Sequence, residues 1–344
     1  MLIAKKLMMC LGIVVMALTL LLPASHAAIS DEQRQFINMM VSKHQFDENA
    51  LHTLFAESTA NEAILQAIAK PWEAKPWFEY YPIFLTEKRL KKGLEFWQQH
   101  QTTLARAEQL TGVPASVIVA ILGVETFYGT YTGKYSVFDA LNTLGFHYPR
   151  RATFFRSELE QLLLLAREEK FELAALQGSY AGAMGWGQFI PSSYRAYALD
   201  FDGDGVRDLL NNPVDAIGSV ANYFKRHGWQ AGQAVAYPVE VSGQQYQRYL
   251  SKKLKPQHTW QTLQQAGVRL SLAASQVTSL KPDSQVKLLE LAGSEVPEYW
   301  LVLGNFYTIT RYNHSPLYAM VVHQLSQQLE QAFKPHVSAT SLFE

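Results

Sequence analysis

The stretch Ser116–Gly129, which reads SVIVAILGVETFYG, decides how the rest of the chain is interpreted. Val117–Val124 is an unbroken run of apolar and small residues, and a helix that is apolar on all sides is a buried helix. Ser116 follows Pro114 and predicts the N-cap of this helix, and Gly129 predicts its end. The sequence therefore predicts one core helix around which the remaining helices pack.

Glu125 lies in the last turn of the predicted core helix. Burial raises the pKa of a carboxyl, and the negative end of the helix dipole raises it further. A carboxyl that stays protonated near neutral pH can act as a general acid. The alternative is a glutamate that reaches the surface or pairs with an arginine, because structural pairing also perturbs carboxylates.

Composition limits the classes of function. The chain has 344 residues, of which 48% are hydrophobic and 17% charged, so we expect a sizeable core and two or three domains. The many aromatic residues (17 Tyr, 18 Phe and 7 Trp) suit ligands that stack on rings, such as carbohydrate, and equally suit a large core. The formal net charge is zero and there is no polybasic run, so we expect no nucleic-acid partner.

Residues 1–27 have the pattern of a cleaved secretory signal. A charged pair, an apolar run and a small-residue cleavage site follow one another: Lys5, Lys6, Leu7–Leu22 and Ser25–Ala27. The single cysteine, Cys10, lies inside this signal, so the mature chain has neither a disulfide nor a cysteine nucleophile. Cys10 is also too early for lipidation at the end of the apolar run. We expect an exported protein without a lipid anchor.

The region before the core helix is predicted to be mainly helical. Asp31–Ala69 has the periodicity of two or three amphipathic helices, and Lys88–Thr111 that of one helix ending at Gly112. Between them Pro71–Thr86 holds three prolines and predicts an extended segment. Its aromatic side chains either line a groove, with Tyr80 as the best candidate, or plug two helical layers together.

Two features after the core helix suggest ligand contacts. Arg150 and Arg151 open a predicted helix, Ala152–Glu169, where positive charge opposes the helix dipole. These arginines either bind an acidic partner or anionic ligand, or are surface charges that face only solvent. The glycine-rich Gly178–Tyr194 predicts a ligand-facing wall, and it lacks the lysine of a phosphate loop and the spacing of a dinucleotide loop. We expect no organic cofactor.

The stretch DFDGDGVRDLLNNPVD at 200–215 predicts a calcium loop. Alternating carboxylates, a turn glycine and a backbone carbonyl occupy the first seven positions: Asp200, Asp202, Asp204, Gly205 and Val206. Asn211 stands where a bidentate glutamate is usual, so Asp215 is the expected closing ligand of a longer loop and Asp208 a weaker substitute. The alternative is an aspartate-rich turn without metal. We expect Ca²⁺ in a structural role.

The composition changes again after a predicted helix at Asp215–Gly228. Strands are expected at Ala234–Val241, Val286–Ala292 and Glu298–Thr308. Short helical or irregular pieces are expected at Thr259–Ala266 and Leu272–Leu280, and a last helix at Pro316–Phe333. We expect the tail after Lys334 to be frayed.

Five ordered stretches together resemble one family. GVETFYG, NTLGFHYPRR, GSYAGAMGWGQFIPSSY, DFDGDG…PVDAIGSVANYF and NFYTITRYN resemble the lytic murein transglycosylase B family (glycoside hydrolase family 103), from about Phe78 to Leu325. The resemblance implies an α+β, mainly α fold with a lysozyme-like catalytic core, a helical N-terminal domain, an EF-hand-like calcium loop and a small β domain. The expected bounds are 28–112 for the helical domain (joined by helix 316–333), 113–229 for the core and 230–304 for the β domain. Residues 305–344 are expected to return to the core and to form the C-terminal helix.

The resemblance also implies roles for individual residues. Glu125 matches the single catalytic carboxylate. The matched glycan-contacting residues are Tyr80, Arg150, Arg151, Ser179, Gln188, Phe189, Tyr223, Tyr307 and Tyr312. The matched calcium ligands are Asp200, Asp202, Asp204, the Val206 carbonyl and Asp215.

The reaction implied by the resemblance is cleavage of peptidoglycan without water, in cell-wall turnover or remodelling. Glu125 would protonate the oxygen between N-acetylmuramic acid and N-acetylglucosamine, and would then accept the proton of the muramoyl O6 hydroxyl as a 1,6-anhydro ring closes. The rival readings are a hydrolytic muramidase and a non-catalytic peptidoglycan-binding module. The implied setting is the periplasm, with a monomer that acts on glycan strands and has cell-wall synthesis or division proteins as possible partners.

Overall fold

The computed structural model describes residues 29–69, 75–271 and 280–340, with side chains up to residue 333. The predicted signal and nearly all of the predicted piece Leu272–Leu280 lie outside the described residues. The helices are α1 (Asp31–His44), α2 (Glu48–Glu57), α3 (Glu62–Ile68), α4 (Trp77–Phe84), α5 (Glu87–Gln99), α6 (Gln101–Thr111), α7 (Ala115–Thr126), α8 (Val137–His147), α9 (Ala152–Glu169), α10 (Pro191–Tyr197), α11 (Pro213–Arg226), α12 (Trp260–Gln265), α14 (Gly304–Tyr312) and α15 (Pro316–Thr340). Short 3₁₀ turns are η2 (Pro149–Arg151), η3 (Leu173–Ala175) and η4 (Gln245–Tyr249).

The core helix of the sequence analysis is α7. Nearly all of its residues are buried, and α15 and α5 pack against it. The predicted start was wrong: α7 begins at Ala115, because the carboxylate of Glu108 accepts the Ala115 N–H at 2.9 Å and replaces a side-chain cap. The predicted end was late, since Phe127 already adopts the left-handed conformation with φ 51° and ends the helix after Thr126.

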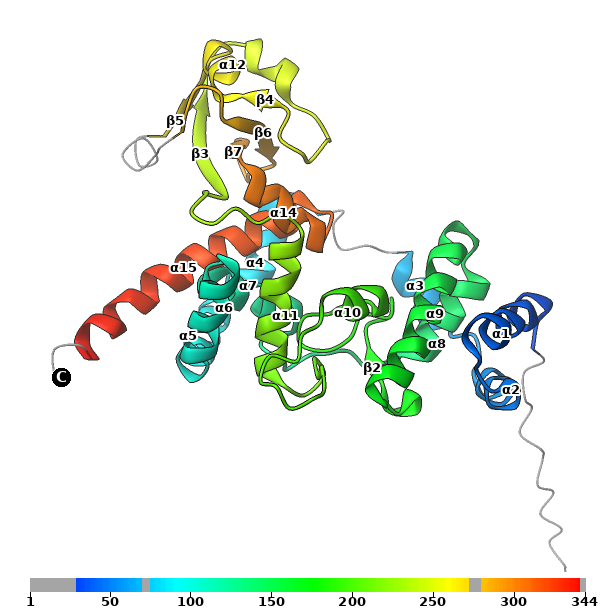
Figure 1. The fold of residues 1–344 in the computed structure, drawn as a ribbon. Helices are drawn as coiled ribbons and strands as arrows, with labels where there is room; N and C mark the ends of the chain where they lie inside the picture. The colour runs from blue at the N-terminus through cyan, green and yellow to red at the C-terminus, as the bar shows by residue number, and fades with distance from the viewer. Residues whose placement is uncertain (1–28, 70–74, 272–279, 341–344) are drawn as a thin grey trace, which may run out of the picture.

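The strands form a sheet at one end of the molecule, beyond α14 (Figure 1). Its order is β4-β6-β7-β3-β5, and neighbouring strands are antiparallel. The strands are β3 (Ala236–Val241), β4 (His258–Thr259), β5 (Val268–Leu270), β6 (Gln285–Leu291) and β7 (Glu298–Val302), and a separate pair is β1 (Tyr135–Ser136) with β2 (Gln177–Gly178). This sheet and α12 enclose a small second core that includes Trp260, Leu288 and Leu301. The sequence pattern missed β5 as a strand.

Three predicted elements were wrong in type or extent. The proline-rich segment contains helix α4, which tolerates Pro82 because Trp77 and Tyr80 are buried on one face and tertiary packing outweighs propensity. The predicted helix 88–111 is two helices that meet at His100. The predicted strand Glu298–Thr308 ends at Val302, and α14 follows.

The last helix is longer than expected, because α15 continues to Thr340 where a frayed tail was predicted. Other predictions are confirmed: Asp31–Ala69 holds three helices, and α9 has the expected bounds. Among the described residues no single helix is long and apolar enough to span a membrane, and only the pair α6 and α7, bent by 114°, meets the criterion together.

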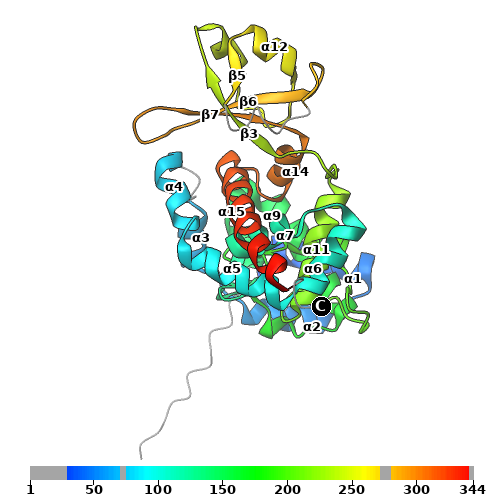
Figure 2. The same cartoon turned by 90° about the vertical axis from the view of Figure 1, so that its left-hand side faces the viewer.

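Helix α4 connects the helical part of the molecule with the sheet. It lies beneath the loop that joins β6 and β7 (Figure 2), and the Phe78 N–H donates to the Ala292 carbonyl at 3.2 Å. The indole of Trp77 donates to Glu298 Oε1 at 3.1 Å, and the indole of Trp300 donates to Oε2 of the same carboxylate at 3.3 Å. The glutamate thus fixes the start of α4 against β7.

Candidate active site

Glu125 faces a cavity of 330 Å³ at the junction of three helices. Helix α4 provides one wall, α7 the second, and α15 with the residue after α14 the third. The lining residues are Tyr80, Ile83, Phe84, Val124, Glu125, Asn313 and Tyr318. Glu125 is the only carboxylate among the described residues that line this cavity.

The carboxyl of Glu125 has one hydrogen-bond donor from α15. The Tyr318 hydroxyl donates to Glu125 Oε1 at 2.6 Å. Burial raises the pKa of Glu125 from 4.5 to about 7, and the bond from Tyr318 opposes that rise. Glu125 therefore keeps its proton to near neutral pH, as the sequence predicts, and one side of the residue stays open to the cavity.

A second cavity, of 350 Å³, has an aromatic floor. The rings of Tyr223 and Tyr312 both meet Phe189 edge-on, each with centroids 5.8 Å apart. Tyr312 also lies parallel to Tyr318, at 6.5 Å between centroids and 7° between planes. Tyr318 lines the Glu125 cavity and Tyr312 the second one, so this ring pair lies between the two cavities, which share no lining residue.

The glycine-rich wall is fixed by hydrogen bonds to its backbone. Tyr312 donates its hydroxyl to the Gly187 carbonyl at 2.5 Å. Gln188, with a left-handed φ of 51°, donates through Nε2 to the carbonyls of Thr132 and Gly185 at 2.9 and 3.0 Å. The Ser179 hydroxyl is occupied by the N–H groups of Ala181 and Ala183 and shapes the turn.

The remaining predicted glycan contacts fall at different places. Arg150 and Arg151 are both exposed, and of the two only Arg151 lines the aromatic cavity, with its guanidinium 4.3 Å from the centre of the Phe154 ring. Tyr307 lines a third cavity, of 520 Å³, which shares no lining residue with the Glu125 cavity. The structure therefore groups Tyr80 with Glu125, groups five predicted residues around the aromatic floor (Arg151, Gln188, Phe189, Tyr223 and Tyr312), and separates Tyr307 from both.

Sequence reasoning missed Tyr318 and Asn313 as site residues. Asn313 ends the stretch NFYTITRYN, so it carried a signal that was not used. Tyr318 is an aromatic residue near the start of an amphipathic helix, and its position on the apolar face indicates only a core residue. The contact with Glu125 joins residues 193 positions apart, which a local pattern does not reveal.

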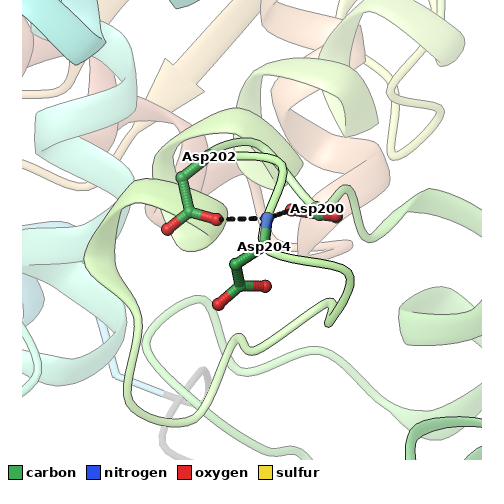
Figure 3. Close-up of side chains that lie close together, drawn as sticks. All are labelled: Asp200, Asp202 and Asp204. Carbon is green, nitrogen blue, oxygen red and sulfur yellow. Dashed lines mark hydrogen bonds between the residues drawn. The ribbon is translucent and has the colours of Figure 1, made fainter.

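The predicted calcium loop brings its three alternating carboxylates together. The candidate ligand oxygens of Asp200, Asp202 and Asp204 all lie within 4.8 Å of one another (Figure 3). The loop turns through Gly203 and Gly205, whose φ values are 83° and 97°. Three carboxylates this close repel one another, and Ca²⁺ prefers clustered oxygen ligands. The donor set therefore fits calcium.

Asp215 has a different environment from the three clustered carboxylates. It is fully buried, and its two oxygens accept the N–H groups of Phe201 at 2.7 Å and Asp208 at 2.8 Å. Asp215 thus holds the loop closed by accepting these two backbone N–H groups. Val206 is exposed and donates its N–H to Asp204 Oδ1 at 2.9 Å.

Residues 29–327 match the family described as transglycosylase SLT domain. The chain belongs to this family. A relative in Escherichia coli (strain K12), membrane-bound lytic murein transglycosylase B, is 44% identical over 304 residues, which cover 86% of this chain and 81% of that protein. The match confirms the family recognised from the five sequence stretches.

Solved structures of transglycosylases have the same fold. Soluble lytic transglycosylase SltB1 from Pseudomonas aeruginosa is 45% identical with a TM-score of 0.82, covering 88% of this chain and 99% of that one. Escherichia coli SLT35, in complex with calcium, is 43% identical with a TM-score of 0.80, covering 88% and 94%. SltB3 from Pseudomonas aeruginosa, in complex with NAG-anhNAM-pentapeptide, is 32% identical with a TM-score of 0.77, covering 87% and 79%. These likenesses confirm the mainly helical α+β transglycosylase fold.

Proposed function

We propose that this protein is a peptidoglycan lytic transglycosylase that cleaves the bond between N-acetylmuramic acid and N-acetylglucosamine and leaves a 1,6-anhydromuramoyl end. Its family membership and the Escherichia coli relative named as a lytic murein transglycosylase support the activity. The observation that carries the chemistry is one carboxyl, Glu125, with a pKa of about 7 in a cavity with no second acid among its described lining residues.

Glu125 performs both proton transfers in this proposal. Protonated near neutral pH, it gives its proton to the glycosidic oxygen as that bond breaks, and the N-acetyl group of the sugar stabilises the cationic centre. The resulting carboxylate accepts the proton of the O6 hydroxyl while that oxygen bonds to C1. Most glycosidases need a second carboxylate to act as nucleophile or to activate water. The ring closure consumes no water, so one carboxyl that alternates between acid and base is enough.

The glycan lies across both cavities in this proposal, passing the Tyr312–Tyr318 ring pair between them. Tyr80 meets the sugar at Glu125, while Gln188, Phe189, Tyr223 and Tyr312 form the platform of the neighbouring subsites, since sugars stack on aromatic faces. Ser179 keeps the turn of the wall. Arg150 and Arg151 face the anionic groups of the peptide stems, and Tyr307 contacts a more distant part of the strand.

The test is the mass of the products from purified murein. Anhydro products, about one water lighter than the hydrolysed ones, are expected from the wild type. Products of hydrolysed mass would make the protein a muramidase, and binding without any product would make it a docking module.

We also propose that the loop 200–215 holds a structural Ca²⁺ through Asp200, Asp202, Asp204 and the Val206 carbonyl, with Asp215 completing the loop. The relative SLT35, solved in complex with calcium, supports this assignment. No organic cofactor enters the reaction.

The substrate places the protein outside the cytoplasm. We further propose that it is a periplasmic monomer released by signal cleavage, without a lipid anchor, that works beside cell-wall synthesis or division proteins. The Escherichia coli relative is named membrane-bound, so labelling with radioactive palmitate distinguishes the two arrangements. Incorporated label would overturn the unanchored form.

A further inference from the structure

Arg89 joins two walls of the Glu125 cavity without touching Glu125 itself. From α5, its Nε donates to the Gly123 carbonyl of α7 at 3.0 Å. Its Nη1 donates to two carbonyls at the end of α4, those of Ile83 at 3.0 Å and Phe84 at 2.5 Å. Ile83 and Phe84 line the cavity, and Gly123 comes two residues before Glu125.

The guanidinium of Arg89 is committed to these carbonyls. It forms no ion pair with any described carboxylate, and burial lowers its pKa. Its central carbon lies 5.2 Å from the ring centre of Phe84 and 5.3 Å from that of Phe127, which hold the planar group from both helices. A half-buried cation that donates to backbone carbonyls of two helices holds those carbonyls in place.

The backbone of Arg89 is fixed to the same place. The Tyr128 hydroxyl donates to the Arg89 carbonyl at 3.2 Å. This approach depends on Gly123, because a Cβ there would lie 2.5 Å from the Tyr128 hydroxyl oxygen. Arg89 is therefore tied to the end of α7 through both its side chain and its carbonyl.

Helix α4 reaches the cavity with Tyr80 buried and with packing against α15, but its two ends are held differently. Its start is fixed by Trp77 and Glu298, but it has no side-chain cap, and Pro82 removes a backbone donor from its second half. The last carbonyls of a helix need partners; Arg89 supplies one for Ile83, and it joins the Thr86 N–H, at 3.0 Å, on the carbonyl of Phe84.

We propose that Arg89 is a positioning residue that sets the width of the Glu125 cavity by tying the end of α4 to α7. This inference rests on the proposed function, because the width matters for how a glycan strand meets Glu125. Lysine cannot replace arginine here, since a single ammonium does not reproduce the planar fork that reaches carbonyls of two helices.

The experiment compares Arg89→Lys and Arg89→Gln with the wild type on soluble glycan strands. We expect KM to rise about tenfold in both variants, the effect of losing roughly one hydrogen bond from a charged donor. We also expect the alkaline limb of the kcat profile to move to lower pH, because a wider cavity admits water and reduces the burial that raises the pKa of Glu125. The described groups facing Glu125 across the cavity are Tyr80 and Tyr318, which the substitutions leave in place.

The direction of the pH shift separates position from charge. If Arg89 acted only through its charge, Arg89→Gln would raise the pKa of Glu125 and Arg89→Lys, which keeps the charge, would leave that pKa unchanged. This result would overturn the proposal. The matched control is Lys88→Gln, which removes an exposed cation 5.6 Å from the ring centre of Phe127 but cuts no bond to α4. It should keep the wild-type KM and pH profile.

Hydrogen exchange gives a second readout that needs no turnover. We expect the peptide 77–86 to exchange faster in Arg89→Lys while 31–69 is unchanged. Unaltered exchange in 77–86 would overturn the positioning role, and so would a lowered Tm with the KM and pH profile of the wild type. If Arg89→Gln fails to fold, the result for Arg89→Lys decides. Failure of the proposed function is seen separately, as hydrolysed products or no products from the wild type.

Discussion

The Tyr318 hydroxyl donates to Glu125 Oε1 at 2.6 Å and joins the last helix to the end of the core helix. The bond favours the ionised carboxylate, while burial favours the protonated acid. The balance between the two keeps the pKa of Glu125 near 7, where the residue can give a proton and later accept one.

Replacing Tyr318 by Phe should shift the pH dependence of the reaction. The variant loses the bond that lowers the pKa of Glu125, so that pKa should rise above about 7 by on the order of one unit. The alkaline limb of kcat should move to higher pH, opposite to the Arg89 variants. Tyr246→Phe, which alters a phenol pair in the β domain, is the control. An unmoved limb would show that the hydroxyl does not act on Glu125.

The Glu125→Gln variant should remain folded and lose activity. The amide has the shape of the acid but cannot transfer a proton, so release of products from murein should fall by roughly 10²–10⁴. Product release is followed by mass spectrometry, with circular dichroism as the check on folding. Wild-type release by this variant would exclude Glu125 from the reaction.

The stability of the wild type should depend on pH in a way that the stability of Glu125→Gln does not. The folded-state pKa of Glu125 is about 7 and the ordinary value is 4.5, so its protonated form is favoured in the folded state. The contribution of protonated Glu125 to the free energy of unfolding is fully present below pH 4.5 and is lost as the pH rises through about 7. Glu125→Gln should therefore gain roughly 3 kcal/mol relative to the wild type between pH 4 and 8. Urea unfolding across this range measures the difference, and a pH-independent difference would contradict the raised pKa.

Calcium should stabilise the folded protein. Saturating Ca²⁺ at about 100 times Kd contributes roughly 2.7 kcal/mol, which raises Tm by about 4 °C in a chain of this size. EDTA should reverse the rise, and Asp202→Asn should reduce it. The control is Asp283→Asn, an exposed carboxylate in the β domain. A Tm that ignores both Ca²⁺ and EDTA would remove the metal from the loop.

The sequence was most informative where one local pattern determines the outcome. The unbroken apolar run of α7 predicts burial, and burial predicts the raised pKa of Glu125. The alternating aspartates likewise predict a cluster of three carboxylates. These features depend on residues close together in the chain, so composition and spacing are enough.

The errors occur where distant residues decide the local structure. Helix α4 forms despite its prolines because Trp77 and Tyr80 are buried against other elements. The start of α7 is set by Glu108, seven residues before Ala115. The strand expected through Thr308 stops early, and Asn305 in α14 binds the backbone of Gln230, 75 residues away. No local window of the sequence contains both Asn305 and Gln230. Glu108 and Ala115 do share one, but residue type alone does not show that this glutamate accepts that N–H.

The pairing of Glu125 with Tyr318 has a consequence for synthesis of the protein. Tyr318 lies near the start of α15, which is the last helix and packs along α7. A nascent chain that has not yet reached residue 316 already contains its reactive acid but neither the phenol beside it nor the helix that covers it. The acid and the phenol that lowers its pKa therefore come together only when nearly the whole polypeptide has been made.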